Sequence, residues 1–331
     1  MRCAVVGAGA WGTALADLLA RMRHEVTLWA YEPEVAEHIT RHGENARFLP
    51  GVRLQPSLRA TADLASALAG AALVAFATPS HVLRSVARQG DGTIPADATV
   101  AVATKGIERG SLALMSQVIA DEVPGRPVVA LSGPSFASEV AAGYPTALVA
   151  ASRDADAAAM VQQAFSGERF RVYTHHDVVG VELGGALKNV IAVAAGITEG
   201  LGLGFNARAA LITRGLAEMT RLAVALGASP LTLSGLAGVG DLVLTCTGSL
   251  SRNRSLGAEL AAGVPLDRIL ASRDTVAEGV VTTQSAHALA AREDVEMPIV
   301  AAVHRILFER HPPQDAITEL MTRELRAEHE R

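Results

Sequence analysis

The stretch from Arg2 to Leu19, RCAVVGAGAWGTALADLL, decides the fold of the N-terminal half. Its first five residues are a short apolar run typical of a buried strand, and leucines follow at helical spacing. Between them lies a Gly-x-Gly-x-x-Gly motif formed by Gly7, Gly9 and Gly12. The first glycine permits a tight turn, the second lets the backbone approach a pyrophosphate, and the third lets the helix pack on the strand. We therefore predict a dinucleotide site at the helix N-terminus; the alternative is a tight turn without a ligand.

A second strand is predicted at residues 25–29, and Ala30, Tyr31 and Glu32 follow it. In dinucleotide-binding domains that carry this glycine motif, an acidic residue near the end of the second strand binds the ribose of NAD, whereas an arginine accommodates the 2′-phosphate of NADP. Neither residue type stands at the strand tip. Glu32 could bind ribose, but Glu32-Pro33-Glu34 is also typical of an acidic helix start. The sequence therefore leaves NAD or NADP open.

Apolar runs and helical patterns then alternate as far as about residue 174. This alternation predicts a parallel sheet covered by helices on both faces, with ligands at the carboxyl ends of its strands. Continuous helical pattern follows, including a helix over 208–226 with Asn206 as its N-cap and Gly227 after its end. We predict an α/β fold: an N-terminal Rossmann-type parallel sheet domain at residues 1–178, an all-α C-terminal domain at 179–331, and an active site between them. The further strands are expected near 72–77, 98–103, 127–131, 145–150 and 169–173, and helices near 61–69, 80–88, 111–122 and 154–164.

Composition narrows the classes of function. The 331 residues suit two domains, and half of them are hydrophobic. A net charge of −5 gives no basic surface for nucleic acid, so we expect a small-molecule partner. The sequence has two cysteines, shows no signal peptide, and contains no apolar run of the kind that membrane insertion needs. A cytoplasmic protein without a metal site is the expectation.

One buried helix is predicted to carry a cation. The stretch GVELGGALKNVIAVAAGI, residues 180–197, is apolar on nearly every side, yet it contains Lys188. A lysine is almost never fully buried unless it is paired or borders a cavity. Its helical neighbours Gly184, Gly185 and Ala192 leave room for a ligand. In the alternative, the glycines serve close helix packing and Lys188 extends its ammonium group to solvent.

The protein contains only one other lysine, Lys105. It follows the predicted strand at 98–103, where its ammonium group is well placed for a phosphate or another substrate oxygen; the alternative is a solvated turn lysine. His81 is read as a packing or capping residue at a helix start. The adjacent His175 and His176 are expected to point in different directions at the domain junction, and not to bind a metal.

Several blocks in order resemble the NAD(P)-dependent glycerol-3-phosphate dehydrogenases, the bacterial form in particular. The resemblance covers almost the whole chain. Two departures concern the cofactor: Ala10 where many relatives have serine, and Tyr31 where relatives often have histidine or arginine. The blocks that carry the resemblance are Gly7–Ala14, Thr78–Val82, Ala103–Gly106, Ser132–Ala137, Gly184–Val190, Thr213–Met219, Gly240–Thr247 and Ser251–Arg254.

The resemblance implies a role for individual residues. Lys188 would be the catalytic proton acceptor, and Lys105 would touch both cofactor and substrate. Besides these lysines, substrate contacts would come from Gly133, Ser135, Asp241, Ser251, Arg252 and Asn253. Cofactor contacts would come from Gly7, Gly9, Trp11, Gly12, Tyr31, Lys105, Ala137, Arg252, Val276 and Glu278.

The implied reaction is reduction of dihydroxyacetone phosphate to sn-glycerol 3-phosphate by NADH or NADPH, for phospholipid synthesis, and the resemblance also implies a homodimer. Lys188 can polarise the ketone oxygen and give it a proton, and Arg252 offers a fork for the phosphate. Burial and Lys105 would lower the pKa of Lys188, whereas Asp241 would raise it, and the sequence does not rank these effects. It also leaves feedback regulation open. Alternatives are a related dehydrogenase for another hydroxy acid or phosphosugar, and a non-catalytic dinucleotide sensor.

Overall fold

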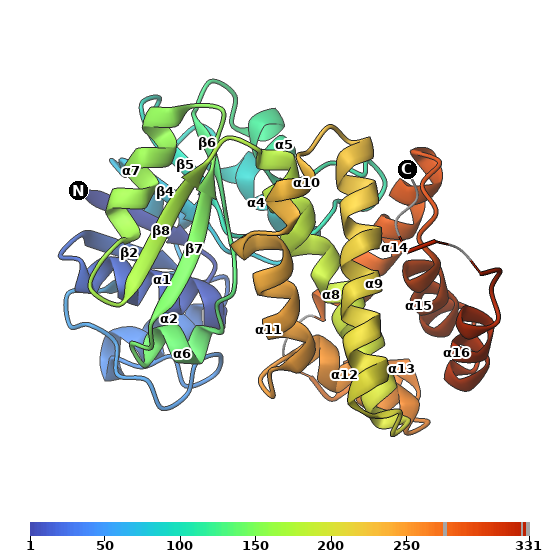
Figure 1. The fold of residues 1–331 in the computed structure, drawn as a ribbon. Helices are drawn as coiled ribbons and strands as arrows, with labels where there is room; N and C mark the ends of the chain where they lie inside the picture. Colours follow the sequence, from blue (N-terminus) through green and yellow to red (C-terminus); the bar gives the residue numbers. More distant parts are fainter. Residues whose placement is uncertain (274–276, 326, 329–331) are drawn as a thin grey trace.

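The computed structural model describes residues 1–273, 277–325 and 327–328. Its N-terminal half is an eight-stranded sheet with helices on both faces (Figure 1). The strand order is β3-β2-β1-β4-β5-β6-β7-β8. The strands are β1 (Arg2–Val6), β2 (Glu25–Trp29), β3 (Arg59–Thr61), β4 (Leu73–Phe76), β5 (Thr99–Val102), β6 (Val128–Ser132), β7 (Thr146–Ala151) and β8 (Phe170–His175).

Alternating side chains of the central strands β1, β4 and β5 enter two separate cores, which explains why these strands are apolar on both faces. Val5 of β1 joins the core beneath one layer of helices, whereas Ala4 and Val6 join the core beneath the other. The first layer contains α1 (Ala10–Arg21), α2 (Pro33–His42), α6 (Ala137–Ala141) and α7 (Ala155–Phe165). The second contains α3 (Leu64–Leu68), the 3-10 turn η1 (Ser80–Val82), α4 (Leu83–Gly90) and α5 (Met115–Glu122).

The sheet departs from the sequence prediction at two places. β7 runs antiparallel to β6, while the other paired strands are parallel, so the expectation of an all-parallel sheet is wrong there. The connection between them contains only the five-residue α6, which is too short to carry the chain back along the sheet as a crossover helix does. The second difference is β3, which occupies the start of the predicted helix 61–69; the helix itself begins after Asp63, whose side chain caps it.

The C-terminal half is helical and is organised around α8 (Val178–Gly200). In Figure 1, α8 begins beside the sheet and runs into the middle of the other helices. Gly196 and Gly257 let α12 approach α8 closely, because a Cβ at either position would lie within 2.0 Å of a carbonyl oxygen of the other helix. The other elements are α9 (Gly204–Ala225), α10 (Pro230–Leu233), the π-helical turn η2 (Leu236–Gly240), α11 (Asp241–Thr247), α12 (Arg252–Ala261), α13 (Leu266–Ala271), α14 (Glu278–Arg292), α15 (Pro298–Phe308) and α16 (Pro313–Met321).

Two details of the helical half correct or confirm the sequence prediction. Asn206 lies inside α9, which is capped by Leu203, so its prediction as the N-cap is wrong. Gly227 follows the helix end with φ of +86°, as a residue after a helix end often does. By length and hydropathy, α8 and the segment Pro230–Thr247 could cross a membrane, but 89% of the α8 window is buried inside the chain. α8 is therefore the core helix of the domain.

Candidate active site

The glycine-rich loop has the geometry that its sequence predicts. Gly7 adopts φ of +113°, and its N–H donates to the Trp29 carbonyl of the neighbouring strand. A Cβ at Gly12 would lie 1.9 Å from the Gly7 carbonyl oxygen, so only glycine lets α1 approach the turn. A Cβ at Gly9, the N-cap of α1, would meet no described atom within 4 Å. The backbone is thus open at the helix N-terminus, where an anion is favoured.

Trp11 supports a ligand at this end of the helix. Its indole Nε1 is buried and has no hydrogen-bond partner among the described residues. Buried polar groups are nearly always hydrogen-bonded, so an unpaired indole N–H beside an open helix N-terminus fits a bound polar molecule. The open helix N-terminus and the unpaired indole N–H are therefore two separate observations that fit a bound dinucleotide.

Lys105 follows the end of β5 and makes several polar contacts. Its Nζ donates to the Gly133 carbonyl at 3.1 Å and pairs with Asp241 Oδ2 at 2.6 Å. The Ser135 hydroxyl donates to the same Gly133 carbonyl at 3.1 Å. Gly133 has φ of +139°, and a Cβ there would meet the Leu148 side chain at 2.9 Å. Lys105, Gly133, Ser135 and Asp241 thus come together from three separate parts of the chain.

Lys188 is buried and reaches the same carboxylate. Its Nζ donates to Asp241 Oδ1 at 2.5 Å and to the Thr245 hydroxyl at 3.0 Å, and only 10% of its side chain is exposed. The alternative in which its ammonium group extends to solvent is therefore wrong. Thr245 is one turn after Asp241 on α11, a spacing that could have indicated its role from the sequence.

The glycines beside Lys188 serve packing, so the expectation that they leave room for a ligand is wrong. A Cβ at Gly184 would lie 2.4 Å from the Ala237 carbonyl oxygen of η2. A Cβ at Gly185 would lie 2.5 Å from the Ser132 hydroxyl at the end of β6. The alternative interpretation is confirmed on this point, since α8 packs tightly against the sheet and against η2.

The surroundings of Lys188 lower its pKa to about 8. Burial is the largest cause, because it disfavours the charged ammonium group. The carboxylate of Asp241 opposes this shift, and the positive charge of Lys105 adds to it. A pKa near neutrality allows Lys188 to donate a proton in one direction of a reaction and to accept it in the other.

The start of α12 lies against α8 near Lys188. Ser251 caps α12 by accepting the Arg254 N–H, and Arg252 is exposed in the first turn. The Asn253 side chain donates to Asn189 Oδ1 and accepts from the Gly279 N–H, both at 3.0 Å. Asn253 therefore ties α12 to α8 and α14, a structural role that its block of sequence did not reveal.

The remaining predicted cofactor residues differ in their surroundings. Glu278, at the start of α14, accepts from the N–H and hydroxyl of Ser80, at 3.1 and 2.7 Å, and burial raises its pKa. Tyr31 is 78% exposed, with its ring edge-on to that of Trp29. Ala137 is the first residue of α6, and Val276 lies outside the described residues.

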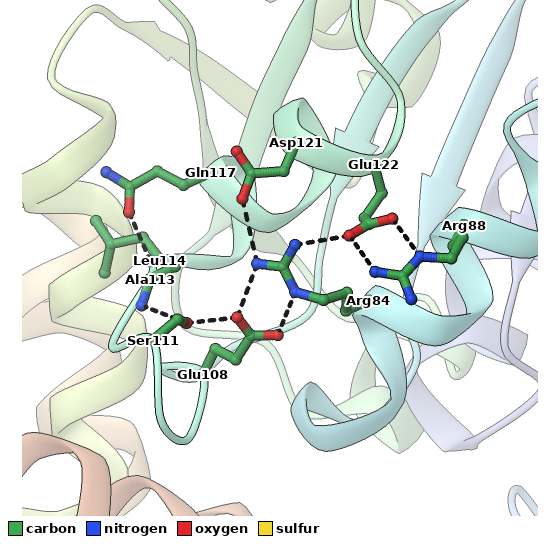
Figure 2. Close-up of polar contacts among 9 residues, drawn as sticks. All are labelled: Arg84, Arg88, Glu108, Ser111, Ala113, Leu114, Gln117, Asp121 and Glu122. Atoms are coloured by element: carbon green, nitrogen blue, oxygen red, sulfur yellow. Dashed lines mark hydrogen bonds and ion pairs between the residues drawn. The ribbon is translucent and has the colours of Figure 1, made fainter.

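An ion-pair network anchors the segment that follows Lys105 (Figure 2). Arg84 of α4 donates to both oxygens of Glu108 at 2.8 Å, and it also contacts Glu122 and Asp121 of α5. Arg88 also forms an ion pair with Glu122. Hydrogen bonds from the two arginines lower the pKa of the Glu122 carboxyl group to about 2, and Arg88 makes the larger contribution. No motif marks these residues in the sequence. They hold the chain three residues beyond Lys105 on the face of α4 and α5.

The described residues contain no group of three potential metal-binding side chains of the His, Cys, Asp and Glu types. The rings of His175 and His176 stack, with centroids 5.1 Å apart and planes 14° apart. The expectation that they point in different directions is therefore wrong.

Comparisons with known proteins cover both halves of the chain. Residues 2–158 match the family described as NAD-dependent glycerol-3-phosphate dehydrogenase N-terminus, and residues 177–318 match the corresponding C-terminus. A glycerol-3-phosphate dehydrogenase [NAD(P)+] of Geobacter sp. (strain M21) is 54% identical over 99% of this chain and 98% of its own length. The protein of that name from Anaeromyxobacter dehalogenans is 52% identical over 99% of this chain and its full length.

Solved structures agree with these matches. The glycerol-3-phosphate dehydrogenase of Coxiella burnetii has a TM-score of 0.94 and 44% identity, covering 97% of this chain and 99% of its own. The Plasmodium falciparum enzyme has a TM-score of 0.89 and 25% identity, covering 99% of this chain and 97% of its own. A ketopantoate reductase from Ralstonia eutropha, at 20% identity and a TM-score of 0.63, shares the fold alone.

Proposed function

The chain belongs to the NAD-dependent glycerol-3-phosphate dehydrogenase family, and from this premise we propose that it reduces dihydroxyacetone phosphate to sn-glycerol 3-phosphate, reversibly, with NADH or NADPH. The observation that carries the proposal is the cluster of Lys188, Asp241 and Lys105 next to the carboxyl ends of β5 and β6. The product would supply glycerophospholipid synthesis.

Lys188 has the properties of the proton donor in this reaction. A reduced nicotinamide supplies hydride to the ketone carbon, and the ketone oxygen then needs a proton. Lys188 can polarise this oxygen and give it a proton from Nζ, and it can take the proton back in the reverse direction. Asp241 and Thr245 hold Nζ in place by hydrogen bonds, and Lys105 adds a second positive charge beside the developing alkoxide. Gly133 and Ser135 lie on the same side of the cluster, within reach of a small substrate.

The phosphate of the substrate would bind at the start of α12. Arg252 offers a bidentate guanidinium group there, and the free N–H groups of the first turn favour an anion. Ser251 and Asn253 shape this turn through their own hydrogen bonds.

Arg252→Ala is expected to raise the KM for dihydroxyacetone phosphate by about tenfold to a hundredfold, because a charge-assisted pair is lost. Steady-state rates as a function of substrate concentration measure this effect. Unphosphorylated dihydroxyacetone, measured at saturating NADH, is the control, since its slow reduction does not use the phosphate site. An unaltered KM for the phosphorylated substrate would remove Arg252 from the phosphate site.

The glycine-rich loop would hold the cofactor pyrophosphate, with Trp11, Tyr31, Ala137, Lys105, Arg252, Val276 and Glu278 around the dinucleotide. Gly9→Ala adds a methyl group where the backbone is open, so we expect a stable protein with at least about tenfold weaker cofactor binding. Gly12→Ala places the methyl group against the Gly7 carbonyl, so we expect a loss of about 1–3 kcal/mol or more in stability. Fluorescence titration with NADH and urea denaturation separate the two effects. Equal behaviour of the two variants would contradict the distinct roles of these glycines.

The reaction itself is tested by following nicotinamide absorbance with dihydroxyacetone phosphate, with NADH and NADPH in parallel. Activity that requires the phosphate group establishes the substrate, and the ratio of the two rates gives the cofactor preference. Binding of both cofactors without turnover would favour a related dehydrogenase for another hydroxy acid or phosphosugar, or a dinucleotide sensor. The sensor is disfavoured because it has no need of a buried lysine with a pKa near neutrality.

We also propose three properties of the protein as a whole: its domain boundary, its oligomeric state and its location. The domains divide between residues 178 and 179, which limited proteolysis can test. The protein is a homodimer, supported by exposed apolar side chains such as Phe205 and Leu231, and light scattering would give its mass. Both cysteines are buried and unpaired, which supports a reducing, cytoplasmic location.

A further inference from the structure

A small cavity borders Lys105 on the inner side of the active site. It is lined by Lys105, Ser132, Glu182 and apolar groups of β5 and β6, and it has room for about one water molecule. The Ser132 hydroxyl is buried and makes no hydrogen bond within the described part of the chain. A cavity of this size that is bordered by an unpaired hydroxyl group and by Lys105 and Glu182 can hold one ordered water molecule.

Glu182 lines this cavity and is hydrogen-bonded to a residue nearer the protein surface. It lies on α8 and is buried, with 8% of the residue exposed. Its carboxyl group contacts the Ser116 N–H at 2.8 Å and the Ser116 hydroxyl at 2.5 Å. Ser116, in the first turn of α5, is itself partly exposed. These groups therefore lie in a row. On one side, Ser116, Glu182 and the cavity lead to Lys105. On the other side, Asp241 joins Lys105 to Lys188.

We propose that Glu182, Ser116 and a water molecule in the cavity form a proton route that recharges Lys188 from solvent after each reduction. This inference rests on the proposed function, in which Lys188 gives its proton to the substrate oxygen. A bound substrate and cofactor would cover the open side of Lys188, so a route behind Lys105 permits proton exchange while the site is filled.

The proton transfers balance. After reduction Lys188 is a neutral amine, and Lys105 gives one ammonium proton to Asp241 Oδ2. A half-turn of this carboxyl group brings the new O–H to Lys188, which takes the proton and regains its charge. Lys105 is recharged by the cavity water, which takes a proton from the Glu182 carboxyl group in the same step. The Glu182 carboxylate is finally protonated from solvent through the Ser116 hydroxyl.

The electrostatics around Glu182 agree with this role. Burial raises the pKa of Glu182 to about 7, while the two hydrogen bonds from Ser116 oppose the shift, so the group can both hold and release a proton near neutrality. Lys105 is the charged group across the cavity, with Asp241 and Lys188 behind it on α11 and α8. Asp177, at the N-terminus of α8, is engaged by Thr232 and Ser229 of the α10 segment.

Glu182→Gln tests the route, and Glu218→Gln is a matched control. Glu218 is also buried, also accepts two hydrogen bonds, from the N–H groups of Ile299 and Val300, and also has its pKa raised to about 7 by burial. It lies on α9 and caps α15, away from the lysine cluster. A purely structural effect of removing a buried carboxyl group should appear in both variants.

Rapid mixing of enzyme, NADH and dihydroxyacetone phosphate distinguishes the steps. With Glu182→Gln we expect a first turnover at the wild-type rate, because Lys188 starts protonated, followed by steady-state turnover that is slower by about tenfold or more. Glu218→Gln should show the wild-type pattern. Steady-state turnover at the wild-type rate in Glu182→Gln, or a first turnover slowed as much as later ones, would overturn the proposal.

Ser132→Ala provides a second test of the same route in case Glu182→Gln does not fold. It removes the unpaired cavity hydroxyl and leaves Glu182 in place, and we expect the same separation of first and later turnovers, to a smaller extent. Wild-type rates throughout would count against the route. Inactivity of the wild-type enzyme with dihydroxyacetone phosphate would instead reject the proposed function, which the same experiment measures separately.

Discussion

Lys188→Met is expected to lower kcat for dihydroxyacetone phosphate reduction on the order of 10⁴-fold, because it removes both the proton donor and the charge beside the ketone oxygen. Methionine has a similar length and suits the apolar surroundings of α8, so the helix should keep its packing. Asp241 retains Lys105 as a partner in the variant, which avoids an unpaired buried carboxylate. The expected protein is folded and inactive.

Cofactor affinity is the control for this experiment. The glycine-rich loop lies on α1 and does not involve Lys188, so the NADH dissociation constant should change by less than about threefold, which is less than 1 kcal/mol. Fluorescence titration and thermal unfolding would be measured on the same preparation as kcat. Loss of cofactor binding together with activity would show that Lys188 is structural, and activity within tenfold of wild type would reject it as the proton donor.

Asp241→Asn is expected to have two large effects. It leaves the ammonium groups of Lys105 and Lys188 buried beside each other without their carboxylate, which should cost about 3–5 kcal/mol of stability. It also removes the charge that raises the pKa of Lys188, so this pKa should fall below about 8. In the proposed reaction, reduction requires protonated Lys188, so its rate should decline as pH rises through this pKa. The alkaline limb of the kcat profile should therefore move to lower pH.

Asp177→Asn provides a matched control for this variant. Asp177 caps α8 and is partly buried, which by itself would raise its pKa. Hydrogen bonds from Thr232, Gly180 and Ser229 together outweigh this effect and lower the pKa of Asp177. Its replacement should reduce stability in urea denaturation but leave the alkaline limb where it is. If Asp241→Asn shifted neither the limb nor the unfolding midpoint, the carboxylate would not be the centre of the lysine cluster.

The sequence predicts those features that depend on local pattern. The strand, turn and helix around Gly7 follow from spacing and glycine chemistry, and the alternation beyond them gives the two-faced sheet. Lys105 and Lys188 are conspicuous because the chain has no other lysine. The family resemblance places Asp241 near them.

The sequence pattern does not predict features that depend on contacts between distant segments. The antiparallel β7 depends on how short α6 is, and the role of Gly184 and Gly185 depends on which carbonyl and hydroxyl groups face them. Nothing local shows that Asp241 bridges both lysines. The Arg84 network joins residues 24 to 38 positions apart, and no motif records such pairings (Figure 2).

The burial of α8 from Gly180 to Thr198 has a consequence for hydrogen exchange and cooperativity. This helix is central to the helical core, packs on β6 and carries Lys188, so its amides can reach solvent only when both halves of the chain open. The amides around Lys188 should therefore exchange at the rate of global unfolding, while the exposed N-terminal turns of α9 exchange by local fraying. Lys188, the proposed proton donor, thus belongs to a unit that we expect to exchange only with global unfolding, and changes of specificity would arise in the loops and helix ends that surround it.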